Sequence, residues 1–185
     1  CNGNKSEVFT GYATLDGDAR WYMAPIADLY KTQIRSLAYF LNQEFGDIIP
    51  VKTITVAASA ELSDDQSIEK KRQNESPFRW VGGDPFVYEY HDALFYQIWD
   101  LNTEPADILR AYRDRTLTEK LHKNYDTLAD TLVVPEKEVT QWHEKIDTLL
   151  SVDPSLFIED LERVYSLLRN NYFKRIQCPT VIALS

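Results

Sequence analysis

Apolar residues recur at helical spacing over much of this 185-residue chain. The clearest stripe in the first half has apolar side chains at steps of three or four residues: Ile26, Tyr30, Ile34, Leu37, Leu41 and Phe45. This spacing puts one apolar face along a helix. Pro25 suits the first turn of such a helix, and Gly46 suits its end. The pattern therefore predicts a helix over residues 25–45.

The second half of the chain predicts several further helices, because the same spacing returns there. They are expected over residues 91–101, from Pro105 with a break near Thr116, from Pro135, and after the cap-plus-proline pair Asp153-Pro154. The last stripe is the most regular in the chain: Phe157, Leu161, Val164, Leu168, Tyr172 and Ile176. Residues 102–185 are thus predicted to be mainly helical.

Other stretches have the composition of β-strands. They are residues 7–15 with a bend at Gly11, the β-branched run 51–58, the short segment 86–90, and an apolar tail over 181–184 that could add an edge strand. Val, Ile, Thr, Tyr and Phe favour strands. The predicted fold class is α+β (or α/β), with a small sheet and a strand–helix–strand unit in the N-terminal half. The predicted core includes Leu37, Leu41, Ile54, Val56, Leu161, Val164 and Leu168.

The length suits a single domain with its own core. We expect residues 1–6 to be a flexible lead or tether, residues 7–101 an α/β core, and residues 102–185 a helical region packed on that core. No apolar run approaches the length of a membrane span.

The chain is acidic, with a net charge of −9. Its longest basic run, Lys70-Lys71-Arg72, is flanked by acidic residues. Because proteins that bind a phosphate backbone carry a positive face, this argues against nucleic-acid binding. Tyr and Trp suit half-buried contact sites. We therefore expect Trp21, Trp80, Tyr88 and Tyr90 to form a binding surface for a protein or small ligand of unknown identity.

Motifs of common catalytic and metal sites are missing from the sequence. The three histidines, His91, His122 and His143, lack metal-ligand spacing, and Gly82-Gly83 is not followed by a phosphate-loop lysine. No Gly-x-Ser-x-Gly elbow occurs. We accordingly predict no catalytic residue, no metal and no cofactor, and the chain leans towards a non-enzyme.

Cys1 has two interpretations. The sequence begins on this cysteine and continues into a small polar stretch, which is typical of a mature bacterial lipoprotein. Cys1 would then be the lipid attachment point, with residues 2–6 as tether, and several acyl chains would hold the protein on the membrane. A terminal cysteine is alternatively both nucleophile and amine base, as in N-terminal-nucleophile amidohydrolases.

A further pattern runs through residues 7–58: Gly11, Gly17-Asp18-Ala19-Arg20-Trp21, Pro25, Gln33-Ile34-Arg35-Ser36-Leu37, Leu41, Pro50-Val51 and Ile54-Thr55-Val56. With these residues the segment resembles the nuclease-related (NERD) domain. The resemblance implies a restriction-endonuclease-like fold with a metal-dependent Glu-x-Lys just upstream. That place holds Gly3-Asn4-Lys5, without a carboxylate, so only Lys5 has a counterpart. Ala24 stands where the family has Asn.

Three functional hypotheses follow. The first is a non-enzymatic, lipid-anchored protein of the bacterial cell envelope, in the periplasm or on the outer membrane, that binds a protein or small ligand. It touches the membrane through its lipid alone. The second is a NERD-like nuclease fold truncated upstream of its catalytic strand. The third is an accessory subunit of a larger assembly.

Overall fold

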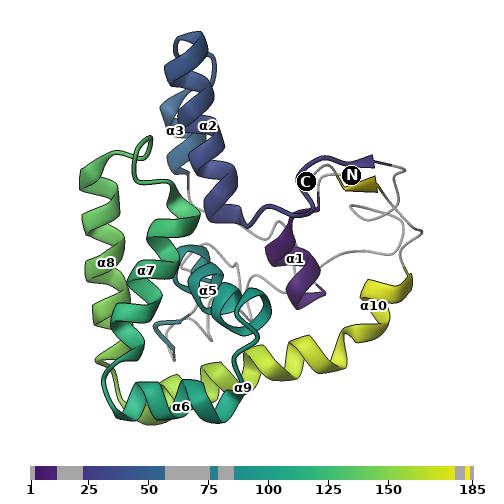
Figure 1. Cartoon of the computed structure of the whole chain (residues 1–185), viewed down its shortest axis with the longest axis vertical. Helices are drawn as coiled ribbons and strands as arrows, with labels where there is room; N and C mark the ends of the chain where they lie inside the picture. The colour runs from purple at the N-terminus through teal and green to yellow at the C-terminus, as the bar shows by residue number, and fades with distance from the viewer. Residues whose placement is uncertain (1–2, 12–22, 57–75, 79–85, 178–181, 184–185) are drawn as a thin grey trace.

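The protein is described by a computed structural model that covers residues 3–11, 23–56, 76–78, 86–177 and 182–183. Its elements are α1 (Lys5–Thr10), β1 (Met23–Ala24), α2 (Lys31–Phe45), α3 (Val51–Thr55), α5 (Tyr88–Phe95), the π-helix η1 (Tyr96–Asp100), α6 (Pro105–Arg113), α7 (Leu117–Ala129), α8 (Glu136–Leu150), α9 (Pro154–Asn170), α10 (Tyr172–Gln177) and β2 (Ile182–Ala183). Figure 1 shows α5 in the middle of the body, with α6 and α9 along its lower end.

The predicted α+β fold with a sheet is wrong. Within the described ranges the chain is overwhelmingly helical, and its strands β1 and β2 are two residues long and pair in parallel. Met23 pairs with Ile182 and Ala24 with Ala183. β2 falls inside the apolar tail expected over 181–184, but a two-residue pair is too short to form one wall of a core.

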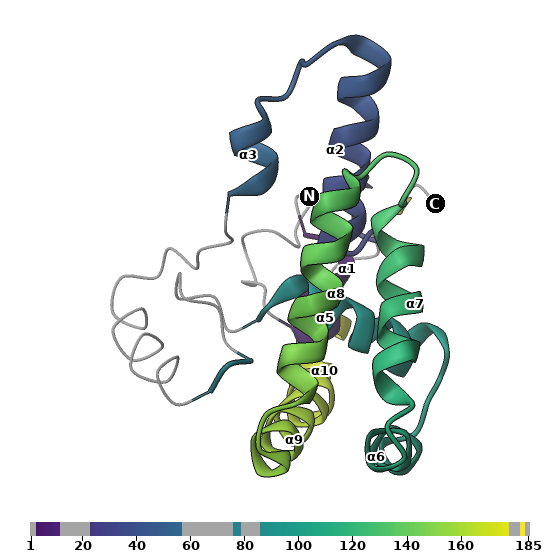
Figure 2. The same ribbon diagram turned by 90° about the vertical axis from the view of Figure 1, so that its left-hand side faces the viewer.

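The run predicted as a strand over 51–58 forms helix α3 in its described part, residues 51–56. Pro50 precedes the first turn, and its carbonyl accepts a hydrogen bond from the Thr53 N–H at 2.8 Å. α3 packs on α2, and the two project together away from the body (Figures 1 and 2). Strand propensity depends on a neighbouring strand to pair with. None of the described segments supplies one beside α3.

The strand predicted over 7–15 is also wrong in its described part, because residues 5–10 form helix α1. The Asn4 side chain accepts from the Glu7 N–H at 3.1 Å, and the Asn4 N–H donates to the Glu7 carboxylate at 3.0 Å. This reciprocal capping box starts a helix. The segment 86–90 likewise enters a helix, since α5 begins at Tyr88.

The helices of the second half are confirmed. α6 begins at Pro105, the break expected near Thr116 separates α6 from α7, and α8 follows Pro135. α9 begins at Pro154, and the Asp153 side chain caps it by accepting from the Ser155 N–H at 2.8 Å. In the first half, α2 starts later than predicted, at Lys31, because residues 25–28 form a turn.

The core is an aromatic and aliphatic cluster around α5, whose eight residues are all buried. Phe9 of α1 stacks on Phe95 of α5 with ring centroids 4.2 Å apart, and Tyr112 stacks on Phe157 at 4.0 Å. Such contacts add to the free energy gained from burial. α5 contacts α7, α2, α1 and α8, so it connects most of the described fold.

Some of the predicted core residues are buried, and others are partly or largely exposed. Ile54, Leu161 and Val164 are buried, whereas Leu37 is 40% exposed and Val56 is 60% exposed. Leu41 and Leu168 are half-buried. Leu37 lies on α2 and Val56 directly follows α3, the two helices that project from the body. No described segment buries these two side chains. The division into residues 1–6, 7–101 and 102–185 stays a prediction.

Gly11 ends α1 at a close approach to the end of α9. Its φ is +66°, a left-handed conformation that side chains rarely adopt, and a Cβ there would lie 2.4 Å from the Asn171 Cβ. Asn171 also donates through its side-chain amide to the Thr10 carbonyl at 2.7 Å. The glycine therefore permits the contact that joins α1 to α9.

Gly11→Ala should lower the free energy of unfolding by about 2–5 kcal/mol, the sum of backbone strain and overpacking. Gly46→Ala is the matched control. Gly46 has a φ of +74° but nothing within 4 Å of the added methyl, so it should lose only about 1–2 kcal/mol. Urea denaturation of both variants measures the difference, and equal losses would contradict the close approach.

Candidate functional site

The first turns of α1 and α2 meet above α5 and η1. The Lys5 backbone N–H donates to the Leu29 carbonyl at 2.9 Å, and the Lys31 N–H donates to the Ser6 hydroxyl at 3.0 Å. The first N–H groups of a helix have no partner within the helix, so such bonds satisfy them. Each helix thus begins with a lysine, and the two lysines belong to one bonded unit.

Lys5 is held by Asp100, the last residue of η1. Its ammonium group lies 2.5 Å from one Asp100 oxygen and 4.7 Å from the centre of the Tyr30 ring. The Tyr30 hydroxyl donates to the other Asp100 oxygen at 2.5 Å. Burial and the neighbouring Asp100 raise the pKa of Tyr30, so the phenol keeps its proton and acts as a donor.

Lys31 is placed differently from Lys5. Its ammonium group lies over the Tyr88 ring, 5.6 Å from the ring centre, a cation–π arrangement. Within the described residues no carboxylate lies within ion-pair distance of it. One turn further along α2, Arg35 forms an ion pair with the buried Glu89 of α5. The start of α2 therefore presents a cation that lies over an aromatic ring, while Arg35 in the next turn is paired with a core residue.

Asp92 lies beneath both helix starts and is fully buried. One of its oxygens accepts from the Ser6 hydroxyl at 2.6 Å, and the other accepts from the Thr32 N–H and hydroxyl, both at 2.8 Å. Burial raises the pKa of Asp92 from 3.8 to about 6, although the bonds from Ser6 and Thr32 and the charge of Lys31 oppose this rise. The carboxylate is ionised at neutral pH.

This raised pKa predicts a pH dependence of stability. The native state binds the Asp92 proton more tightly than the unfolded chain does, so the group's contribution is present below about pH 4 and is lost as the pH rises through 6. Between pH 4 and 7 the wild type should lose about 2–3 kcal/mol relative to Asp92→Asn. Urea denaturation at several pH values measures this, and parallel curves for the two proteins would contradict it.

The π-helix η1 adds a further indication of a functional site. It follows α5 directly, and its five residues place Asp100 at the end next to Lys5 and Tyr30. π-helical turns inside helices occur frequently at functional sites. The polar groups of the candidate site therefore come from α1, α2 and the joined α5–η1.

A second polar cluster, His91, Asp160 and Arg163, joins α5 to α9. Nδ1 of His91 lies 2.9 Å from both the N–H and the carbonyl oxygen of Val87, and Nε2 faces Asp160 and Arg163, each at 3.2 Å. Burial lowers the pKa of His91, whereas the pKa of Asp160 is lowered by His91 and Arg163 despite its burial. The three side chains contact one another, which indicates a structural role.

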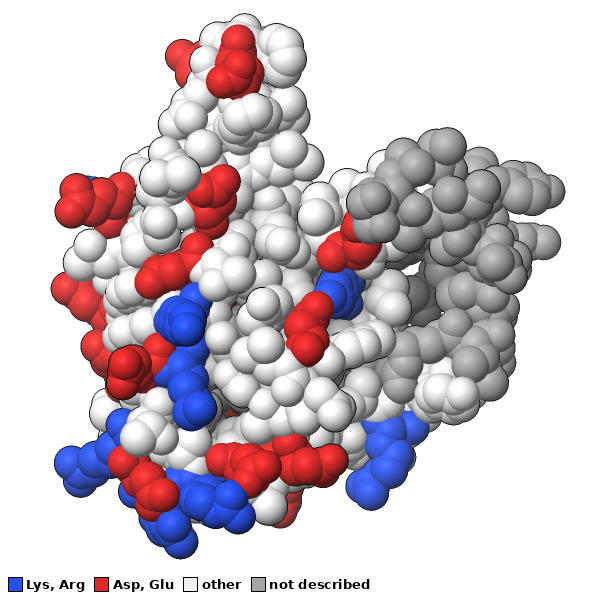
Figure 3. All heavy atoms as spheres, viewed as in Figure 1, with Lys and Arg blue, Asp and Glu red and all other residues white. Residues whose placement is uncertain are grey.

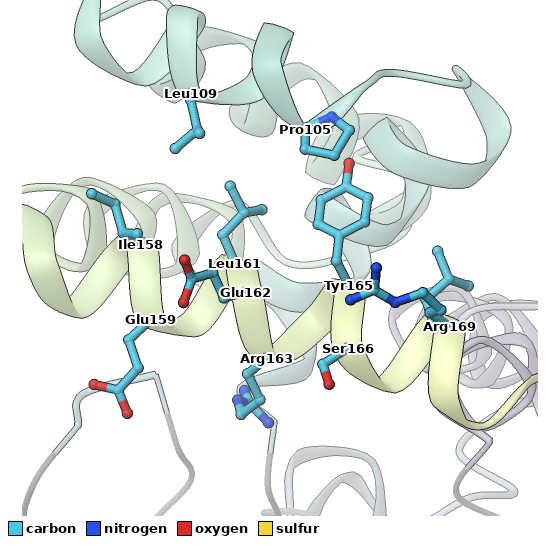
Figure 4. Close-up of a pocket in the computed structure, with 11 residues that line it drawn as sticks. Pro105, Leu109, Ile158, Glu159, Leu161, Glu162, Arg163, Tyr165, Ser166 and Arg169 are labelled. Carbon is cyan, nitrogen blue, oxygen red and sulfur yellow. The ribbon is translucent and has the colours of Figure 1, made fainter.

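The groove between α6 and α9 has a volume of about 850 Å³. Figure 4 shows Pro105 and Leu109 facing Leu161, with Glu159 and Arg163 directed to the other side of α9. The Tyr165 hydroxyl donates to the Thr103 carbonyl at 3.1 Å. Ligand sites need a few convergent polar groups. Two of the charged residues along this groove, Glu159 and Arg163, point to the other side of α9 and do not converge in it, so we place the candidate site at the helix starts instead.

Charge is unevenly distributed on the face shown in Figure 3. Acidic side chains are spread over much of it, and basic ones gather at the lower end, around α6. Two of the arginines of α6 are paired, Arg110 with Asp107 and Arg113 with Asp114. The part of the chain that the structure describes holds no group of three or more His, Cys, Asp or Glu that could bind a metal ion.

The residues predicted as functional are only partly described. Cys1, Trp21 and Trp80 lie outside the described residues. Tyr88 is 8% exposed and Tyr90 is fully buried, with burial and Asp160 raising the pKa of Tyr90. The predicted aromatic binding surface stays a prediction.

The site residues that sequence reasoning missed are Ser6, Lys31, Thr32, Asp92 and Asp100. Asn4, three residues before Glu7, is a helix-start signature and could have revealed the first of the two helix starts. The two aspartates give no such signal, because acidic residues are common throughout the chain.

Comparison with known proteins gives one consistent result. Residues 1–74 match the family described as NAD synthase. The chain is 36% identical over 125 residues to the NH(3)-dependent NAD(+) synthetase of Wolinella succinogenes, and the aligned region covers 68% of this chain and 42% of that protein. It is 48% identical over 120 residues to the glutamine-dependent NAD(+) synthetase of Synechocystis sp., and the aligned region covers 64% of this chain and 19% of that protein. No solved structure matches.

The chain spans less than half the length of these relatives. The match to the Wolinella protein covers 125 residues, so the likeness extends beyond residues 1–74. The α1 and α2 starts lie inside the matched segment 1–74, and Asp92 and Asp100 lie after it.

These findings overturn the functional hypotheses drawn from the sequence. The resemblance to the NERD domain is wrong, since the same segment matches NAD synthase. The lipid-anchored envelope protein is also wrong, as are its binding function and location, because the relatives found are biosynthetic enzymes. None of the described helices is long and apolar enough to cross a membrane. The partner of the chain stays unidentified.

Proposed function

We propose that the chain is part of an NAD(+) synthetase and that the starts of α1 and α2 belong to its substrate site. The observation that carries the proposal is the coincidence of two independent features. The segment that matches NAD synthase, residues 1–74, contains the two lysine-bearing helix starts. These starts are also where charged and aromatic groups converge in the structure.

The chemistry of the site suits a dinucleotide. NAD(+) carries phosphates and flat rings. Lysine ammonium groups bind phosphate oxygens as point charges. The α2 start offers Lys31 for this role, and the rings of Tyr30, Tyr88 and Tyr96 lie around the two lysines.

The two kinds of relative indicate which step of NAD(+) synthesis this chain serves. The chain is similar both to NH(3)-dependent and to glutamine-dependent enzymes. A region common to both kinds would serve what they share, the formation of NAD(+), and the use of glutamine would belong to a part that differs between them. We infer that this chain handles the dinucleotide and its reaction with ammonia.

A chimera tests the proposal in a complete enzyme. The segment of the Wolinella protein that corresponds to this chain is replaced by the chain, and NAD(+) formation is measured with the deamidated dinucleotide, ammonium and a nucleoside triphosphate. We expect NAD(+) to form, and a second chimera with Lys31→Ala to be about ten- to a hundredfold slower, as for loss of a charged hydrogen bond. A chimera that is folded by circular dichroism yet forms no NAD(+) would overturn the proposal.

A further inference from the structure

Asp92 is the point at which the two lysine-bearing helix starts are joined. Both of its oxygens are used, one by Ser6 of α1 and the other by Thr32 of α2. Each donor directly follows a lysine, since Ser6 follows Lys5 and Thr32 follows Lys31. The network closes on itself, because the Ser6 hydroxyl that donates to Asp92 also accepts from the Lys31 N–H at 3.0 Å.

The position of Asp92 is unusual for a carboxylate. Its side chain is fully buried, and it lies within α5, whose residues are all buried. Burial of an ionised group is costly unless hydrogen bonds satisfy it. Three donors do so here, and two of them belong to the first turn of α2, where a negative charge also interacts favourably with the helix dipole.

We propose that Asp92 is a positioning residue for the site at the helix starts: through Ser6 and Thr32 it fixes the first turns of α1 and α2 relative to each other, and so sets where Lys5 and Lys31 present their charges. Asp92 follows the matched segment 1–74, so that segment depends on α5 for the arrangement of its site. The inference rests on the proposed function for what the lysines bind, but not for how they are placed.

Hydrogen exchange of the full chain tests the placement without any ligand. The N–H groups of Lys31 and Thr32 lie in the first turn of α2, so their protection comes from Ser6 and Asp92. Asp92→Asn and Ser6→Ala should speed exchange of these two amides about tenfold or more, while amides in α7 and α9 stay protected. Ser36→Ala is the matched control, because this buried serine of α2 donates to the carbonyls of Thr32 and Leu128 and binds neither of the two amides nor Asp92. It should leave both amides unchanged.

Calorimetric titration with NAD(+) then tests the consequence for binding. We expect Asp92→Asn and Ser6→Ala to raise Kd about ten- to a hundredfold, and Ser36→Ala to leave it unchanged. Variants that lose stability but keep the wild-type Kd would show a merely structural role and overturn the inference. Unchanged exchange at Lys31 and Thr32 would overturn it as well. If the wild type itself fails to bind NAD(+), the proposed function fails, and the exchange rates alone decide the positioning role.

Discussion

Replacing Asp160 with alanine should lower the free energy of unfolding by about 3–5 kcal/mol. Asp160 is 3% exposed and accepts from Arg163 at 2.6 Å while facing His91. Its removal leaves the Arg163 charge over the Phe86 ring without its Asp160 partner and takes the neighbouring carboxylate away from the buried His91 ring. An unpaired buried polar group costs far more than the pair contributes.

Two controls separate this effect from the loss of a helix residue. Glu159→Ala, one position earlier on an exposed part of α9, should change stability by less than about 0.5 kcal/mol. Adding Arg163→Met to Asp160→Ala should restore part of the loss, because the unpaired charge is then gone. Urea denaturation measures the wild type, Glu159→Ala, Asp160→Ala, Arg163→Met and the double variant. Losses that simply add in the double variant would show that the cluster does not act as a unit.

The second large effect is expected at Leu161. This side chain is 3% exposed in the core, so Leu161→Ala should lower the free energy of unfolding by about 2–5 kcal/mol. Leu37→Ala is the comparison, since Leu37 is 40% exposed on α2. It should lose less than about 1 kcal/mol. Similar losses at the two sites would mean that a further segment covers α2.

These two leucines illustrate what periodicity can predict. Both lie on regular apolar stripes, and the sequence ranks them equally as core. A stripe shows that one face of a helix is apolar, but not whether another segment covers it. α9 packs that face on the body, whereas the outer part of α2 projects from it (Figure 1).

The predicted strands failed for a related reason. Residues 51–56 are rich in β-branched side chains, yet they form α3 after Pro50. Propensity is weak where pairing is absent. The helix starts at Pro105 and Pro154 were predicted correctly because the proline and the cap act locally, within one turn.

The candidate site could be predicted only in part. Lys5 drew attention through a resemblance that proved wrong, and Lys31 drew none. The site arises from contacts between residues far apart in the chain, such as Ser6 with Asp92 and Tyr30 with Asp100. No pattern within a short window reports such contacts.

A titration of the isotope-labelled chain with NAD(+), followed by backbone amide NMR, tests directly whether the helix starts bind the dinucleotide. We predict saturable shifts at Lys5, Ser6, Lys31 and Thr32, with the α6–α9 groove unaffected around Leu109. A site with Kd near 1 mM, about −4 kcal/mol, would already be visible. Shifts confined to the groove, or none at about 10 mM NAD(+), would show that the helix starts do not bind the dinucleotide.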